Sequence, residues 1–161
     1  MKPGLTGDVG ENFMNYSPLV APVVALVAWS ILVMLWMMVA RFGEFRKAGI
    51  SLSNAPPGGR GVDLEGKVDA RAQWKSHNYN HLMEQPTIFY AIVLALALMG
   101  MDHPINVALA WSYVGFRIVH SIVQGTINRI AIRFPLFLLA SLCLLGLTIH
   151  AAARIIHDCL G

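Results

Sequence analysis

The chain has 161 residues, of which 56% are hydrophobic and 13% are charged, whereas an ordinary soluble domain has about 45–50% apolar and about 25% charged residues. Its 12 basic and 9 acidic side chains are too few for the water-facing surface of a body of this length. Composition therefore excludes a soluble globular protein and predicts a membrane protein. The formal net charge of +3 is small and dispersed, and without a basic stripe it argues against a nucleic-acid partner.

The first apolar block covers residues 19–40, and its 22 residues are enough for a helix that crosses a bilayer, which needs about 20. We interpret this block as a membrane span. A cleaved signal peptide is the alternative interpretation. It is disfavoured because the block exceeds the usual apolar region of about 7–15 residues and because Lys2 alone supplies basic charge in front of it.

Three further spans follow along the chain. The second, residues 71–101, begins with a polar half that we expect to project from the membrane. The sequence Asp-His-Pro at 102–104 is typical of a helix start, since proline is favoured at the first helical position, and so short a connection predicts an antiparallel hairpin. The third and fourth spans cover residues 104–128 and 134–156. The sequence thus predicts a single all-α domain, an integral membrane four-helix bundle over residues 1–161.

Basic residues gather on one predicted side of the membrane. Seven Lys and Arg residues lie between Arg41 and Lys75, and Arg129 and Arg133 follow in the turn between the third and fourth spans. Basic loops remain on the cytoplasmic side of membrane proteins. We therefore predict a multi-pass protein of the cell membrane, with the loop 41–70 inside the cell and both termini outside.

Two predicted spans carry a stripe of polar side chains, because residues three, four or seven positions apart share one face of a helix. Counted from the hairpin at about 1.5 Å per residue, the two stripes lie at similar depth. Arg117 can then reach Glu84, and Arg133 can close the same region from the fourth span. The stripes consist of His77, Asn80, His81 and Glu84 on the second span and of Arg117, His120, Ser121, Gln124 and Asn128 on the third.

Ionisable groups within a span are costly and indicate a functional site by default, and three interpretations of this region stay open. Arg117 and Glu84 form only a structural ion pair, or the surplus of cationic and amide groups binds an anionic polar ligand from the cytoplasm. In the third interpretation His77, His81 and Glu84, with His120, bind a metal. Nearby arginines disfavour a cation, and a haem between His81 and His120 is disfavoured because their depths differ by about 6 Å. We assign no metal site.

Several short motifs follow one another along the chain in a characteristic order. They are Asn80-His81-Leu82-Met83-Glu84-Gln85-Pro86 followed by Phe89-Tyr90, then Arg117-Ile118-Val119-His120-Ser121, Asn128-Arg129 and Arg133-Phe134. Their order and spacing resemble the MAPEG family, the membrane-associated proteins in eicosanoid and glutathione metabolism, and its bacterial members most of all. The resemblance covers most of the chain, including the four spans and the long loop after the first.

This resemblance implies a homotrimer of four-helix subunits, with glutathione bound between neighbouring subunits near the cytoplasmic face. Glutathione has carboxylates that suit cations, an amine that suits an acid, and a thiol whose ionisation suits a positive field. By position, Glu84 would bind the amine, and Arg133 would be the catalytic residue that stabilises the thiolate attacking a lipophilic electrophile from the membrane lipids. The glutathione-binding residues would be Arg71, Lys75, His77, Asn80, His81, Glu84, Arg117, His120, Gln124 and Arg129.

Two positions depart from the catalytic members of the family. Gln124 stands where several of them have a tyrosine that contacts glutathione, and Asn80 stands where a prostaglandin E synthase-like member has an arginine. We expect a membrane-type glutathione transferase or peroxidase. A non-catalytic MAPEG-like binding or partner protein is the alternative, and a metal-dependent membrane enzyme is a third hypothesis.

Overall fold

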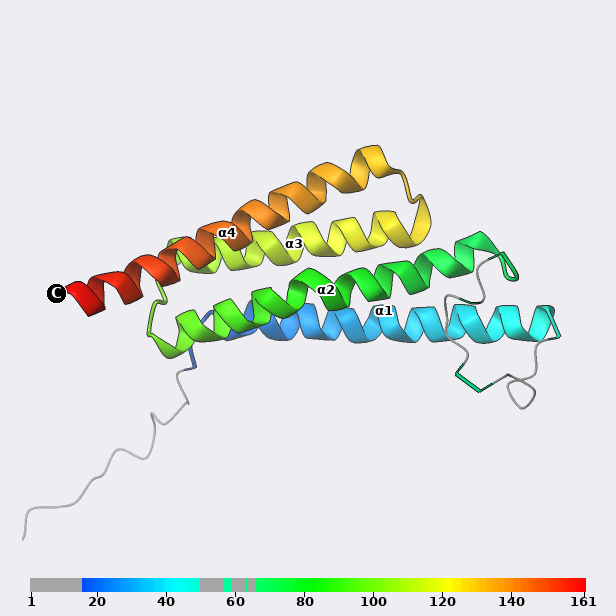
Figure 1. Cartoon of the computed structure of the whole chain (residues 1–161), viewed down its shortest axis with the longest axis horizontal. Helices are drawn as coiled ribbons and strands as arrows, with labels where there is room; N and C mark the ends of the chain where they lie inside the picture. The colour runs from blue at the N-terminus through cyan, green and yellow to red at the C-terminus, as the bar shows by residue number, and fades with distance from the viewer. Residues whose placement is uncertain (1–15, 50–56, 59–62, 64–65) are drawn as a thin grey trace, which may run out of the picture.

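The computed structural model describes residues 16–49, 57–58, 63 and 66–161, and this part of the chain forms four α-helices and no strand. Figure 1 shows the helices as an elongated bundle in which successive helices run in opposite directions. The predicted all-α, four-helix architecture is confirmed. The helices are α1 (Val20–Lys47), α2 (Ala70–Leu98), α3 (Pro104–Thr126) and α4 (Ile130–Leu160).

Local sequence signals set the helix ends. The Asp69 carboxylate accepts a hydrogen bond of 2.6 Å from the backbone two residues on, which satisfies a free N–H group at the start of α2. Gly100 lies beyond the end of α2 with a φ of +65°, a left-handed conformation that glycine adopts without penalty. Pro104 opens α3, where Nδ1 of His103 accepts from the backbone of Ile105 at 3.3 Å. The predicted hairpin between the second and third helices is therefore present.

Three of the helices, α1, α2 and α4, are long and apolar enough to cross a membrane. The third helix is not in this group because its polar stripe lowers its apolar character. That α3 also crosses a membrane remains a prediction. Two helices exceed the predicted spans, since α1 continues beyond residue 40 to Lys47 and α4 begins at Ile130 and ends at Leu160.

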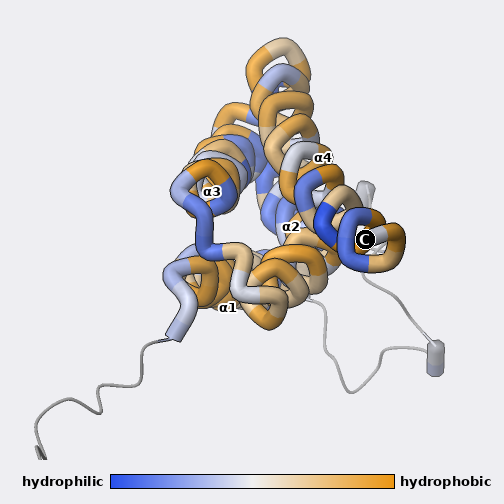
Figure 2. The backbone as a smooth tube through the Cα atoms, turned by 90° about the vertical axis from the view of Figure 1, so that its left-hand side faces the viewer, coloured by the Kyte–Doolittle hydropathy of each residue, from blue (hydrophilic) through white to orange (hydrophobic). Residues whose placement is uncertain are grey.

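Helices that are neighbours in the chain pack side by side, α1 on α2 and α3 on α4, and α2 also contacts α3 and α4. Figure 2, which looks along the bundle, shows predominantly hydrophobic tubes with hydrophilic stretches on α2 and α3. Large apolar side chains are exposed on all four helices, for example Val39 (72%), Leu98 (90%), Ile105 (54%) and Phe134 (61%). Apolar side chains exposed all around a bundle are typical of a surface that faces lipid.

The apolar core occupies the half of the bundle that contains the α2–α3 turn. Phe89 and Tyr113 stack at its centre with ring centroids 4.2 Å apart and planes 8° from parallel. Both rings are fully buried, as are Leu26 of α1, Leu96 of α2 and Leu147 of α4. This half is held by close packing, which replaces the hydrophobic effect where lipid is the solvent.

In the other half, α1 and α3 approach closely at a glycine. A Cβ atom added to Gly125 would lie 2.6 Å from the indole ring of Trp36 and 3.4 Å from the amide nitrogen of Asn78. The missing side chain of Gly125 therefore makes room for Trp36. The Nζ of Lys75 lies over this indole, 5.5 Å from the ring centroid, at cation–π distance.

Candidate functional site

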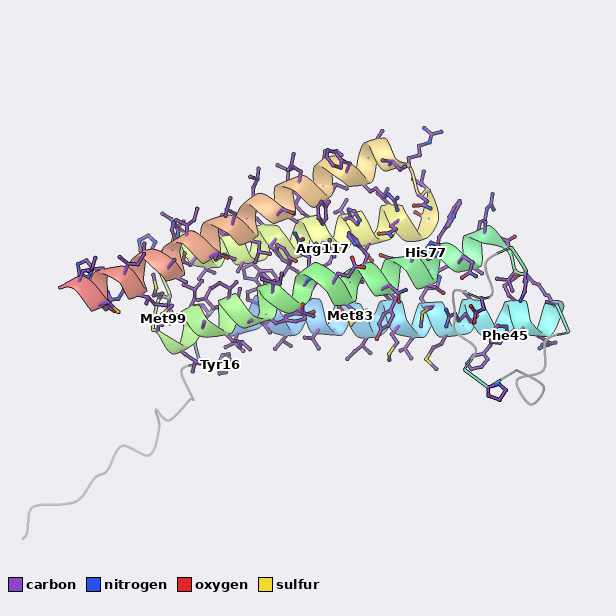
Figure 3. All side chains as sticks on the ribbon, viewed as in Figure 1. Tyr16, Phe45, His77, Met83, Met99 and Arg117 are labelled. Carbon is purple, nitrogen blue, oxygen red and sulfur yellow. The ribbon has the colours of Figure 1, made fainter. Side chains whose placement is uncertain are left out.

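Arg117 is the buried charge around which the polar half is organised. The residue is 1% exposed, and its Nη2 donates to the carbonyl oxygen of His81 at 2.7 Å. Its Nη1 lies 3.3 Å from Nε2 of His81, while its Nε is buried with no hydrogen-bond partner among the described residues. Figure 3 shows Arg117 between the helices and His77 nearer the α3–α4 turn. The guanidinium is thus held by α2, and its Nε donor is unused.

His81 lies between Arg117 and Glu84, so the predicted direct contact between these two charges is not made. Nδ1 of His81 is 3.0 Å from the Glu84 carboxylate, and a carboxylate only accepts, so Nδ1 carries the hydrogen and Nε2 accepts from Arg117. The Glu84 side chain is 68% exposed, which leaves its second oxygen open to a ligand. The result is a carboxylate–imidazole–guanidinium chain in place of a simple ion pair.

His120 connects α3 to α4. Its Nδ1 donates to the carbonyl oxygen of Arg133 at 2.8 Å, and its Nε2 lies 3.1 Å from the side-chain oxygen of Gln124. The rings of His120 and His81 have centroids 5.0 Å apart. The residue count predicted that the two histidines differ in depth by about 6 Å. In the structure their rings lie side by side, because α2 and α3 are offset along their axes.

Arg133 is positioned by the turn between α3 and α4. Its Nη1 donates to the side-chain oxygen of Asn128 at 2.8 Å. Asn128 has a φ of +54°, a left-handed conformation that asparagine tolerates better than most residues, and it follows the last turn of α3. A residue of the α3–α4 turn thus orients the Arg133 guanidinium, although Arg133 itself belongs to α4.

These side chains surround a pocket of about 330 Å³ between α2, α3 and α4, a volume within the range of small-molecule sites. One part of the wall is polar and carries the predicted catalytic residue Arg133 and five of the predicted binding residues. The other part is apolar and comes from α4. The lining residues are His77, His81, Glu84, His120, Gln124 and Arg133 on the polar part and Ile130, Phe134 and Phe137 on the apolar part.

Arg71 and Lys75 do not line this pocket in the single chain. They line another pocket of about 320 Å³, between the end of α1 and the start of α2, together with Glu44, Lys47 and Asp69. The amine of Lys75 donates to the backbone oxygen of Arg71 at 2.7 Å. A ligand in the pocket near Arg133 would meet neither residue of its own chain.

Asn80 and Arg129 are exposed and line none of the pockets described here. Arg117 does not line the first pocket, but it bonds to His81, which does. The stripe predicted on the second helix is therefore split, since His77, His81 and Glu84 face the pocket and Asn80 does not.

The metal hypothesis finds no site in the part of the chain that the structure describes, where no group of three His, Cys, Asp or Glu side chains is arranged to hold an ion. His81 uses both ring nitrogens in the contacts to Glu84 and Arg117. His81 and His120 thus act as hydrogen-bonding links.

Sequence reasoning missed several buried or half-buried polar residues on α2. Asn78 is 1% exposed and donates to the Ser121 hydroxyl at 2.9 Å, and Gln85 donates to the Ser141 hydroxyl at 2.7 Å. Gln73 is 7% exposed, and its Nε2 has no partner among the described residues. Gln73 could have been found by its spacing, since it lies four positions before His77 and so shares a helix face with it.

Comparison with known protein families gives one match that covers most of the chain. The family model named MAPEG family matches residues 19–153. Comparisons with curated protein sequences and with solved structures give no significant match.

Proposed function

The chain belongs to the MAPEG family of membrane proteins, which includes glutathione transferases and peroxidases, and we propose that it binds glutathione between α2, α3 and α4. We further propose that it adds the glutathione thiolate to apolar electrophiles. Glutathione is a substrate in this reaction. The observation that carries the proposal is the two-sided pocket, in which an acid and cationic or hydrogen-bonding groups lie opposite apolar side chains of α4.

The polar wall fits the chemistry of glutathione. Glu84 offers a carboxylate that is 68% exposed and so suits the amine of the γ-glutamyl group. The side chains of His77, Gln124 and Arg133 offer donors for carboxylates. Arg117 stands behind them, and its unused buried Nε adds positive potential in a region of low dielectric constant.

Arg133 is the proposed catalytic residue. A guanidinium beside the thiol favours the thiolate, which is the nucleophilic form of sulfur. The hydrogen bond of 2.8 Å to Asn128 fixes the guanidinium before a substrate arrives, and such preorganisation avoids rearrangement during the reaction.

The apolar wall suits the second substrate. Ile130 and Phe134 line the pocket and are also exposed by 68% and 61% on the outer surface of the bundle. A lipophilic electrophile dissolved in the membrane lipids could therefore approach along α4 while glutathione approaches from water. We propose the cytoplasm as that aqueous side, because the basic residues gather in the loops there.

A homotrimer belongs to the same proposal. The pocket is formed by three helices of one chain, and Arg71 and Lys75 lie in another pocket of that chain. In a trimer with glutathione at the subunit boundary, these two cations would serve the site of a neighbouring copy. Mass measurement of the detergent-solubilised protein tests this assembly.

A non-catalytic glutathione-binding or partner protein is the second candidate. It is favoured by Gln124, an amide that cannot ionise, at a position where it lines the pocket and contacts His120 at 3.1 Å. An amide there can bind a ligand through hydrogen bonds without activating a thiol. Only the reaction itself separates the two candidates.

The experiment combines isothermal titration of reduced glutathione with an assay of conjugation to an aryl halide. We expect saturable binding, weakened by Glu84→Gln, and a conjugation rate that Arg133→Ala lowers by about 100-fold or more. Arg154→Ala is the matched control, because Arg154 also lies on α4, pairs with Asp158 at 2.9 Å and does not line the pocket. Binding without conjugation would favour the non-catalytic candidate, and no binding at millimolar glutathione would contradict both.

A further inference from the structure

A further pocket, different from the one that contains Arg71 and Lys75, adjoins the first pocket at His77, and we call it the second pocket. It has a volume of about 420 Å³ and lies between the start of α2 and the α3–α4 turn, where Gln73, Trp74, His77 and Asn128 line it. His77 lines both pockets. We propose that Gln73 in this second pocket binds the distal carboxylate of the ligand and thereby selects the tripeptide glutathione over shorter thiols. This inference rests on the function proposed above.

The buried amide of Gln73 is the first observation behind this proposal. The side chain is 7% exposed, and its Nε2 makes no hydrogen bond with any described residue. A buried donor without a partner lowers stability. A residue that lines a cavity at such a cost is typical of a binding site in which the ligand supplies the missing partner.

The position of Gln73 on α2 is the second observation. Gln73, His77, His81 and Glu84 follow one another at four, four and three residues, so that they form one stripe along three turns. The distance along the helix from Gln73 to Glu84 is about 16 Å at 1.5 Å per residue. The stripe thus joins the second pocket to the carboxylate of the first.

The length of glutathione matches this distance. Three extended residues span about 10–11 Å, and a hydrogen bond of about 2.9 Å at each end extends the reach to about 16 Å. With its amine at Glu84, an extended tripeptide would therefore bring its glycine carboxylate to Gln73. A dipeptide would be too short to reach both ends of the stripe.

The chemistry of the second pocket is suited to an acceptor. The Gln73 amide, the Asn128 amide and the Trp74 indole all carry N–H donors, and the described residues that line the pocket include no carboxylate. A carboxylate would bind there with charge-assisted hydrogen bonds. An amine or a second cation would find no counter-charge.

The test compares two ligands on four proteins by isothermal titration. The ligands are glutathione and γ-glutamylcysteine, which keeps the amine, the first carboxylate and the thiol but ends in the cysteine carboxylate, one residue short of the position of the glycine carboxylate. The proteins are the full-length wild type, Gln73→Leu, Gln73→Glu and Ser76→Ala. Ser76 is the matched control, because it is 3% exposed on the same turn of α2, its hydroxyl also lacks a partner, and it lines neither pocket.

We expect wild type and Ser76→Ala to bind glutathione about tenfold more tightly than γ-glutamylcysteine. Gln73→Leu should bind both ligands equally, at the affinity of wild type for γ-glutamylcysteine. Gln73→Glu should weaken glutathione further, because two carboxylates would repel each other. Thermal unfolding should show that Gln73→Leu is at least as stable as wild type, since the substitution removes an unpaired buried donor.

Two results would overturn the inference while leaving the proposed function intact. One is glutathione binding that Gln73→Leu leaves unchanged, and the other is a loss that is equal for both ligands or that accompanies a change in oligomeric mass. A wild-type protein that binds neither ligand would instead contradict the proposed function, and the role of Gln73 would fall with it.

Discussion

The two ends of the bundle satisfy their buried groups in different ways. At the end with the α2–α3 turn, apolar rings stack as Phe89 does on Tyr113 at 4.2 Å, and the buried amide of Asn106 bonds both to His150 at 2.6 Å and to a backbone oxygen at 3.0 Å. At the end with the α3–α4 turn, the nitrogens Nε of Arg117 and Nε2 of Gln73 are buried without partners among the described residues. Beside the apolar core, the indole nitrogen of Trp29 is the one buried side-chain donor without a partner among the described residues, whereas several such groups lie toward the polar end.

This difference separates stability from function within a single fold. Buried donors without partners cost stability, and proteins tolerate such costs where they bind a ligand. The apolar end therefore maintains the fold, and the polar end provides the candidate site. Substitutions at the two ends should separate the two properties.

The largest effect on stability is expected at the apolar end. Phe89→Ala removes a fully buried ring, and we expect it to lower the free energy of unfolding by about 3 kcal/mol through lost packing. Denaturation in mixed micelles measures this change. Ile88→Ala is the control, because Ile88 lies next to Phe89 in the chain but is itself 59% exposed. An equal loss there would contradict the assignment of this half as the packed core.

The next effect tests the contact between α1 and α3. Gly125→Ala places a Cβ 2.6 Å from the Trp36 ring, and overpacking of this kind costs about 1–3 kcal/mol. Gly115→Ala, also on α3, meets nothing within 4 Å and should stabilise the helix by up to about 1 kcal/mol. The same denaturation assay should therefore give changes in the free energy of unfolding of opposite sign for the two variants. Changes of equal sign would show that Trp36 moves freely.

At the polar end we expect the opposite pattern, in which a substitution changes the free energy of unfolding little and weakens ligand binding. Arg117→Leu removes a desolvated charge, but it also leaves the ring nitrogen and the carbonyl oxygen of His81 without their donor. Because these two effects partly offset each other, we expect the free energy of unfolding to fall by about 1 kcal/mol and glutathione affinity to fall about tenfold. A severe loss of stability with unchanged affinity would make Arg117 a scaffold residue.

The smallest effect is expected for an ion pair outside both ends. Arg154 and Asp158 are four residues apart on α4, with side chains 54% and 52% exposed. Exposed pairs of this kind contribute about 0.3–0.5 kcal/mol, so Arg154→Ala should change unfolding by no more than that. Its effect should also shrink at high salt, which sets the baseline for the other variants.

The sequence predicted what depends on periodicity. Four helices followed from four apolar blocks, and the hairpin followed from the sequence Asp-His-Pro at 102–104. The spacing of Arg117, His120 and Gln124 predicted one buried face of α3, and all three residues are buried. The family was identified from the same motifs and is confirmed by the match over residues 19–153.

What the sequence did not predict depends on how helices rotate and slide against one another. A count of residues set Arg117 against Glu84, but a small offset between α2 and α3 brings His81 between them. Rotation of α2 also turns Asn80 outward and Gln73 inward. Such offsets arise from side-chain packing between helices, and one sequence contains no direct record of them.

The unequal lengths of the helices set how the protein fits a bilayer. With 28, 29 and 31 residues, α1, α2 and α4 rise about 42–46 Å, whereas the 23 residues of α3 rise about 34 Å. A hydrocarbon layer is about 30 Å thick, so only α3 matches it. The longer helices must tilt or extend into water, and Figure 1 shows α1 and α2 continuing past the α3–α4 turn. The bundle therefore presents a step at its polar end, and lipid headgroups beside that step meet α2 directly.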